Sequence, residues 1–127
     1  MSQPTVAFLQ AFADALNNHD IDTLLEMMTD DCVFNAVGGP ELQGKSFVGP
    51  DAVRAGLSAA WKNAPDACWG DGEYYVVGDK GFMETTYKGT TADGARTEAR
   101  MIDVLTFRDG KIAIKNAFRK NRPPVNA

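Results

Sequence analysis

Histidine, cysteine and long apolar runs are scarce in this chain, and each scarcity argues against a class of protein. A single histidine without a Cys-x-x-Cys pair argues against a zinc site. Cys32 and Cys68 are too few for a disulfide scaffold and are expected to be reduced thiols, which favours a cytoplasmic location. No segment approaches the roughly 20 apolar residues of a membrane helix, and the first residues lack the basic start and apolar core of a signal peptide.

Positive charge is also in short supply, because 17 acidic residues outnumber 13 basic ones and give a formal net charge of −4. Nucleic acids and anionic membranes are bound through basic faces, so neither partner is expected. The hydrophobic share of 44% in 127 residues is ordinary for a globular protein and is enough for one domain, residues 1–127, with a core of its own. Because histidine and cysteine, the usual zinc ligands, are so few, we expect no metal, and we expect no cofactor.

The spacing of apolar residues predicts three helices followed by a run of strands. Leu9, Phe12 and Leu16 recur at helical spacing within residues 5–18, a shorter helix follows Asp20 and ends near Met28, and a third begins at Pro50. Strands are predicted over residues 32–37, 67–77, 81–90, 97–107 and 111–119, most of them joined by short Gly-containing turns. This order predicts an α+β fold, in which a strongly curved antiparallel or mixed sheet wraps around three helices.

Asp103 is the residue that most calls for an explanation, because it interrupts the apolar run Met101–Leu105. Strand alternation places it on the same face as Met101 and Leu105, which is the face expected to meet the helices. A tight Asp109-Gly110 turn would place Phe107 opposite Ile112 and Asp103 opposite Asn116. A buried acid needs a partner, so Asp103 is either a structural hydrogen-bonding group or the polar end of a ligand pocket.

The large apolar residues permit two interpretations of the interior. They could simply fill a core, or some of them could line a cavity, because a curved sheet is not filled by three helices alone. In the second interpretation Asn116 orients Asp103, and the predicted wall consists of Phe12, Phe34, Trp61, Trp69, Met101 and Phe118. On the predicted register Lys115 and Arg119 lie on the outer face of the last strand, away from any site.

Three other features are interpreted as structural. Residues 39–46 match the phosphate-loop pattern G-x-x-x-x-G-K-S, but Gly49-Pro50 would break a helix that began there, and the pattern requires such a helix. His19 lies between two predicted helices, where it is expected to cap the first one or to face solvent. The two cysteines have no basic neighbours in sequence that would activate a thiol.

Five segments of the chain resemble the SnoaL-like and ketosteroid-isomerase-like branch of the nuclear transport factor 2 superfamily. They are residues 12–17, 20–22, 28–34, 44–54 and 102–112, and their order and spacing together carry the resemblance. The resemblance implies a cone of curved sheet closed by three helices and a protein that is commonly a homodimer.

The resemblance also implies which catalytic groups to look for. Asp103 is similar in position to the acid that donates to the steroid oxyanion in the isomerases. The tyrosine that shares this task falls at Phe12, and the general base falls at Ala36, beside Asn35. The Asp-Arg-Asp trio of limonene epoxide hydrolase is matched no better, because Met101 occupies the position of its arginine and no acid stands near Asn116.

The leading hypothesis is therefore a small isomerase, cyclase or hydrolase that acts on a compact apolar organic molecule, with Asp103 as acid or hydrogen-bond donor. Two alternatives stay open, a ligand-binding protein without catalysis and a dimerisation module with a closed cavity. The expected partners are the small molecule and a second copy of the chain bound through the outer sheet.

Overall fold

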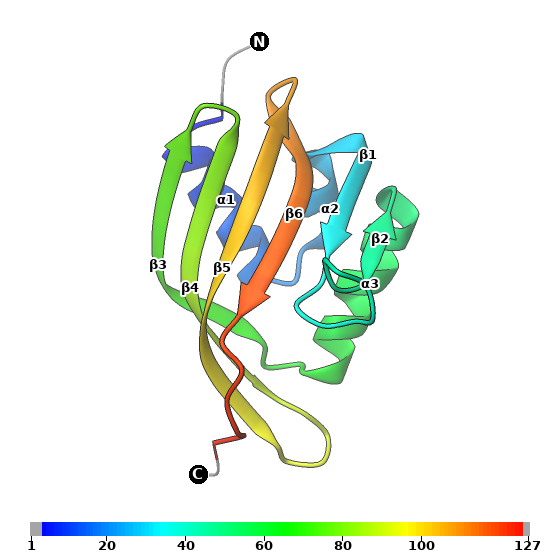
Figure 1. The fold of residues 1–127 in the computed structure, drawn as a ribbon, viewed down its shortest axis with the longest axis vertical. Helices are drawn as coiled ribbons and strands as arrows, with labels where there is room; N and C mark the ends of the chain where they lie inside the picture. Colours follow the sequence, from blue (N-terminus) through cyan, green and yellow to red (C-terminus); the bar gives the residue numbers. More distant parts are fainter. Residues whose placement is uncertain (1–3, 126–127) are drawn as a thin grey trace.

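The structure is a computed structural model that describes residues 4–125. Three helices and six strands follow one another along the chain (Figure 1). The helices are α1 (Val6–Asn17), α2 (Ile21–Glu26) and α3 (Pro50–Asn63). The strands are β1 (Met28–Asn35), β2 (Ser46–Val48), β3 (Cys68–Val77), β4 (Lys80–Thr90), β5 (Arg96–Arg108) and β6 (Lys111–Arg119).

Local sequence signals explain where the helices begin. The side chain of Thr5 accepts a hydrogen bond from the Phe8 backbone N–H at 3.2 Å and caps α1. Asp20 caps α2 in the same way through the backbone N–H of Thr23. Hydrogen bonds from the Thr23 hydroxyl and from this N–H lower the pKa of the Asp20 carboxyl group. Pro50 occupies the first turn of α3, where its missing N–H costs no hydrogen bond.

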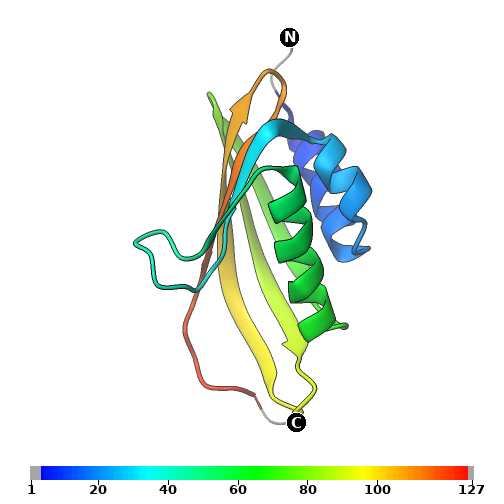
Figure 2. The ribbon, with the colours of Figure 1, turned by 90° about the vertical axis from the view of Figure 1, so that its right-hand side faces the viewer.

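The six strands form one sheet in the order β2-β1-β6-β5-β4-β3. All neighbours are antiparallel except β1 and β6, which run parallel, so the sheet is mixed. The helices cover one face of this curved sheet and leave the other face bare (Figure 2). The core lies between the helices and the inner face, and among its fully buried side chains are Leu9, Phe12, Leu24, Met83 and Leu105.

The predicted α+β architecture and the order of its elements are confirmed, with two local differences. Met28, expected to end the second helix, opens β1 instead. The short strand β2 escaped prediction because its three residues follow a glycine-rich loop and carry no clear alternation. Residues 36–45 form that loop between β1 and β2 and lead into a strand, so the helix that a phosphate loop requires is missing there.

The predicted hairpin register between β5 and β6 is wrong beyond its first pairs. Phe107 does face Ile112, but Thr106 faces Ile114, so Ala113 is an extra residue and forms a β-bulge. From there on, every partner shifts by one position, and Asp103 lies opposite Ala117 instead of Asn116. A one-residue shift turns each following side chain to the other face of the sheet.

Within residues 4–125, none of the three helices combines the length and the apolar character needed to cross a membrane.

Candidate functional site

The bulge turns Lys115 inward, where it forms an ion pair with Asp103. The lysine Nζ donates a hydrogen bond to Asp103 Oδ1 at 2.8 Å, and the two side chains are 3% and 0% exposed. The same ammonium lies 4.8 Å from the centre of the Phe34 ring, which is a cation–π contact. Asp103 Oδ2 has no hydrogen-bond partner among the described residues. Such a buried pair is costly to desolvate, so its presence in this core calls for a role other than stability.

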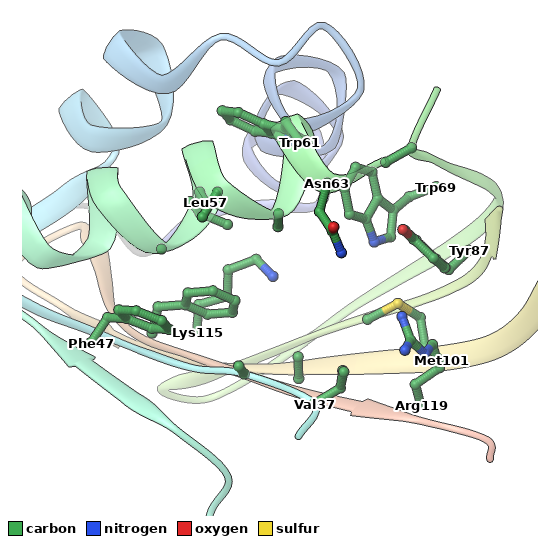
Figure 3. A pocket seen from close by; sticks show the side chains of 17 residues that line it. Val37, Phe47, Leu57, Trp61, Asn63, Trp69, Tyr87, Met101, Lys115 and Arg119 are labelled. Carbon is green, nitrogen blue, oxygen red and sulfur yellow. The ribbon is translucent and has the colours of Figure 1, made fainter. Parts of the chain in front are cut away.

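Lys115 lies on the wall of a cavity of about 510 Å³ between α3 and the inner face of the sheet (Figure 3). Pockets for small organic ligands occupy about 300–1,000 Å³, so the size is suitable. Most of the wall is apolar or aromatic, and its lining residues are Phe34, Ala36, Val37, Phe47, Gly56, Leu57, Ala59, Ala60, Trp61, Asn63, Ala67, Trp69, Tyr87, Met101, Lys115, Ala117 and Arg119.

The structure brings four of the predicted wall residues together around this cavity: Phe34, Trp61, Trp69 and Met101. It places the other two, Phe12 and Phe118, elsewhere, together with Asn116, which was predicted to orient Asp103. Phe12 is fully buried in the core, away from the wall. Asn116 and Phe118 project from the opposite face of the sheet, because the bulge reverses their direction, and Phe118 is 53% exposed.

Asp103 is buried on the inner face as predicted, but it does not itself line the cavity. Its neighbour Lys115 occupies the wall and carries the polar contact toward the cavity. The carboxylate therefore holds the lysine in place, and the lysine is the group that a ligand would meet.

Sequence reasoning missed four polar members of the wall: Lys115, Arg119, Tyr87 and Asn63. The two cations were assigned to the outer face because the bulge was not foreseen. Burial raises the pKa of the Tyr87 hydroxyl, an effect that the nearby Arg119 opposes, so the phenol stays protonated at neutral pH. The Arg119 guanidinium carbon lies 4.9 Å from the centre of the Tyr87 ring.

His19 and Cys32 have structural surroundings. The His19 ring stacks on Trp61 at 4.9 Å and its Nε2 lies 2.9 Å from the carbonyl oxygen of Ala67, so it fastens the turn after α1 to the residues before β3. This differs from the expected helix cap, a position that Asn18 occupies. Burial raises the pKa of the Cys32 thiol, which keeps it protonated and unreactive.

The three helices packed on one face of a curved mixed sheet define the nuclear transport factor 2-like class of folds, and comparison with known proteins agrees. The model of the SnoaL-like domain matches residues 9–114. The chain therefore belongs to the SnoaL-like family within this superfamily. A search of curated proteins found no match.

Solved structures show the same fold at low sequence identity. A protein of unknown function with a cystatin-like fold from Xanthomonas campestris is 18% identical, with a TM-score of 0.81 over 94% of this chain and 92% of that one. A protein described as a candidate polyketide cyclase from Pseudomonas putida KT2440 is 17% identical, with a TM-score of 0.78 over 95% and 93%. A protein with a ketosteroid isomerase-like fold from Catenulispora acidiphila, in complex with trimethylamine, is 17% identical, with a TM-score of 0.76 over 92% and 86%.

The positions at which the resemblance predicts isomerase groups can now be placed. Ala36, where the resemblance predicts the general base, lines the cavity but offers only a methyl group. Phe12, where it predicts the tyrosine, lies in the core instead of at the wall. The polar chemistry of this cavity therefore rests on Lys115, with Arg119, Tyr87 and Asn63 around it.

Proposed function

We propose that this protein is a small enzyme of the isomerase or cyclase type that binds a compact, mostly apolar organic molecule in the cavity between α3 and the sheet. The observation that carries the proposal is the buried Lys115–Asp103 pair, whose ammonium lies on an otherwise mostly apolar wall. The solved structures with the same fold include proteins described as candidate polyketide cyclases and one described as a candidate isomerase, which supports this class of reaction.

In this proposal Lys115 donates a hydrogen bond to an oxygen of the substrate. Its Nζ has three hydrogens, of which one is used on Asp103, so donors are left for a ligand. Negative charge that develops on a carbonyl oxygen would be stabilised strongly there, because the surroundings are apolar and the donor is already in place. Asp103 is a positioning residue that fixes the ammonium and supplies its counter-charge.

The proposal is tested by assaying wild type and Asp103→Asn against a panel of enones, epoxides and polyketide-like 1,3-diketones. An amide keeps the shape and one acceptor but removes the charge that stabilises the ammonium. We expect kcat to fall about tenfold, which corresponds to about 1.4 kcal/mol of transition-state stabilisation, while KM stays within about twofold.

The matched control is Asp31→Asn, the same substitution in the exposed ion pair of Asp31 with Arg108, and it should leave both constants unchanged. Equal kcat in wild type and Asp103→Asn would contradict the role of the pair. Binding of panel compounds without turnover by the wild type would favour the alternative of a non-catalytic ligand-binding protein.

We also propose that the bare face of the sheet forms a homodimer. The cross-strand pairs place five apolar side chains on this face: Phe82, Ile102, Val104, Ile114 and Phe118. Contiguous apolar side chains on an outer surface are typical of protein–protein contacts. Phe118 and Tyr75 are 53% and 50% exposed in the single chain. Such a face supports self-association, since burying it removes apolar area from water.

The oligomeric state tests this. We expect wild type to elute as a dimer in size-exclusion chromatography with light scattering, and Phe118→Lys to elute as a monomer. Val6→Lys changes another exposed apolar residue, on α1, and should leave the dimer intact. A monomeric wild type at high protein concentration would refute the proposed interface.

A further inference from the structure

The wall of the cavity is positively charged although the protein as a whole is acidic. Among the seventeen lining residues are two cations, Lys115 and Arg119, and no carboxylate. The chain carries 17 acidic and 13 basic residues, so a wall whose charged residues are all cations differs from the composition of the whole chain. The charge of Lys115 is compensated from behind by Asp103, which leaves Arg119 as the uncompensated charge of the wall.

Arg119 has no ion-pair partner within residues 4–125. Its guanidinium is placed by the face of the Tyr87 ring at 4.9 Å, a contact that leaves its in-plane N–H groups free to donate. Arg119 ends β6 and is exposed, whereas Lys115 is buried, so the arginine marks the open end of the cavity and the lysine its deeper end. Figure 3 shows Arg119 beside Tyr87 and Met101, with Lys115 farther along the same strand.

The spacing of the two cations sets the length of a ligand that could meet both. Residues 115, 117 and 119 share one face of β6, and four residues of strand separate the Cα atoms by about 13 Å. Ala117, between them, has only a methyl group, and space is therefore left along the strand for the body of a ligand. The two long side chains can converge from this spacing on a molecule of two or three fused rings.

The remaining wall selects for a flat molecule. Aromatic rings line it from several elements: Phe34, Phe47, Trp61, Trp69 and Tyr87. The rings of Trp69 and Tyr87 lie 5.3 Å apart near the arginine and are tilted by 57°. Aromatic side chains stabilise planar conjugated ligands through stacked and edge contacts.

We propose that the ligand of this cavity is a planar conjugated organic anion. A carboxylate or a phenolate oxygen pairs with Arg119 at the open end, the rings lie between the aromatic side chains, and an oxygen at the far end accepts from Lys115. This proposal rests on the proposed function, since it names the chemical class of the molecule that the cavity takes.

Paired probes of equal shape and different charge test it. The probes are 2-naphthoate and 2-naphthamide, with binding followed by calorimetry at neutral pH and low salt. We expect wild type to bind the naphthoate about tenfold more tightly than the amide, as a charge-assisted hydrogen bond to an arginine allows. Arg119→Gln should abolish this preference and leave the affinity for the amide unchanged. Lys120→Gln, the matched control at the adjacent exposed cation, should keep the preference.

The outcomes separate the two proposals. Equal affinities of wild type for both probes would overturn the anionic ligand and leave the cavity a ligand site. A preference that survives Arg119→Gln would overturn the pairing of the anion with Arg119. Failure of wild type to bind either probe would count against the proposed function as well as this inference. A preference lost in Arg119→Gln and restored in part by Arg119→Lys would support the inference.

Discussion

Replacing Lys115 by Met is expected to lower the free energy of unfolding by about 3–5 kcal/mol, because it leaves the carboxylate of Asp103 buried without a counter-charge. Methionine has nearly the length of the lysine stem, so little packing is lost. Since small domains are stable by about 5–15 kcal/mol, this single change removes a large part of the total. Urea denaturation monitored by tryptophan fluorescence measures it.

The second half of the test removes the carboxylate too. Lys115→Met combined with Asp103→Leu should return the free energy of unfolding to within about 1 kcal/mol of wild type or above it, because an apolar pair needs no desolvation. Lys45→Met is the matched control: this exposed lysine also lies over a phenylalanine ring, that of Phe47, at 5.4 Å, and its replacement should cost less than about 0.5 kcal/mol. A loss below about 1 kcal/mol for the single Lys115 variant would show that the pair is not formed.

Filling the cavity from α3 is expected to remove ligand binding without harming the fold. Ala60 is exposed on α3 and lines the cavity, so the indole of Ala60→Trp can enter the space without displacing core side chains. Expelling that indole, or forcing the ligand past it, costs about 1–3 kcal/mol, which predicts a loss of affinity of about 5- to 150-fold for 2-naphthamide. The midpoint of thermal unfolding should stay within a few degrees of wild type.

Ala55→Trp provides the comparison. Ala55 is another exposed alanine of α3, but it is absent from the cavity wall, so its replacement should leave the affinity unchanged. Calorimetric titration of both variants with one neutral probe makes the test independent of Arg119. Equal affinity in the two variants would place the binding site somewhere other than this cavity.

Most of the fold could be predicted from the sequence because its signals are local. The periodicity of Leu9, Phe12 and Leu16, the caps and the Gly-containing turns depend on neighbours a few residues away. The inward direction of Asp103 followed from strand alternation in β5, whose burial pattern alternates as expected. The strand β2 could not be predicted, since it exists only through its pairing with β1.

The errors in β6, which concern Lys115, Asn116, Phe118 and Arg119, come from one residue, the bulge at Ala113. After the Asp109-Gly110 turn, an unbroken register would have turned Ile114 and Phe118 inward, which is the more apolar of the two possible sets. The bulge at Ala113 selects the other set and brings Lys115 and Ala117 to the inner face. Whether a β-bulge forms depends on the strands paired on both sides of the bulged strand. The strand β6 pairs with β5 on one side and on the other with β1, which is far from β6 in sequence. The bulge therefore could not be predicted from the residues near it.

The parallel pairing of β1 with β6 also determines when in folding the site is complete. Val33 lies opposite Ile114, so pairing β1 with β6 closes a loop of about 80 residues. The entropy lost in this closure is large, and the contacts that offset it form only afterwards. The hairpins among β3, β4, β5 and β6 can form early, since their partners are close along the chain. Phe34, beneath the ammonium of Lys115, reaches its place only with this last closure, and a partly folded chain therefore has no site.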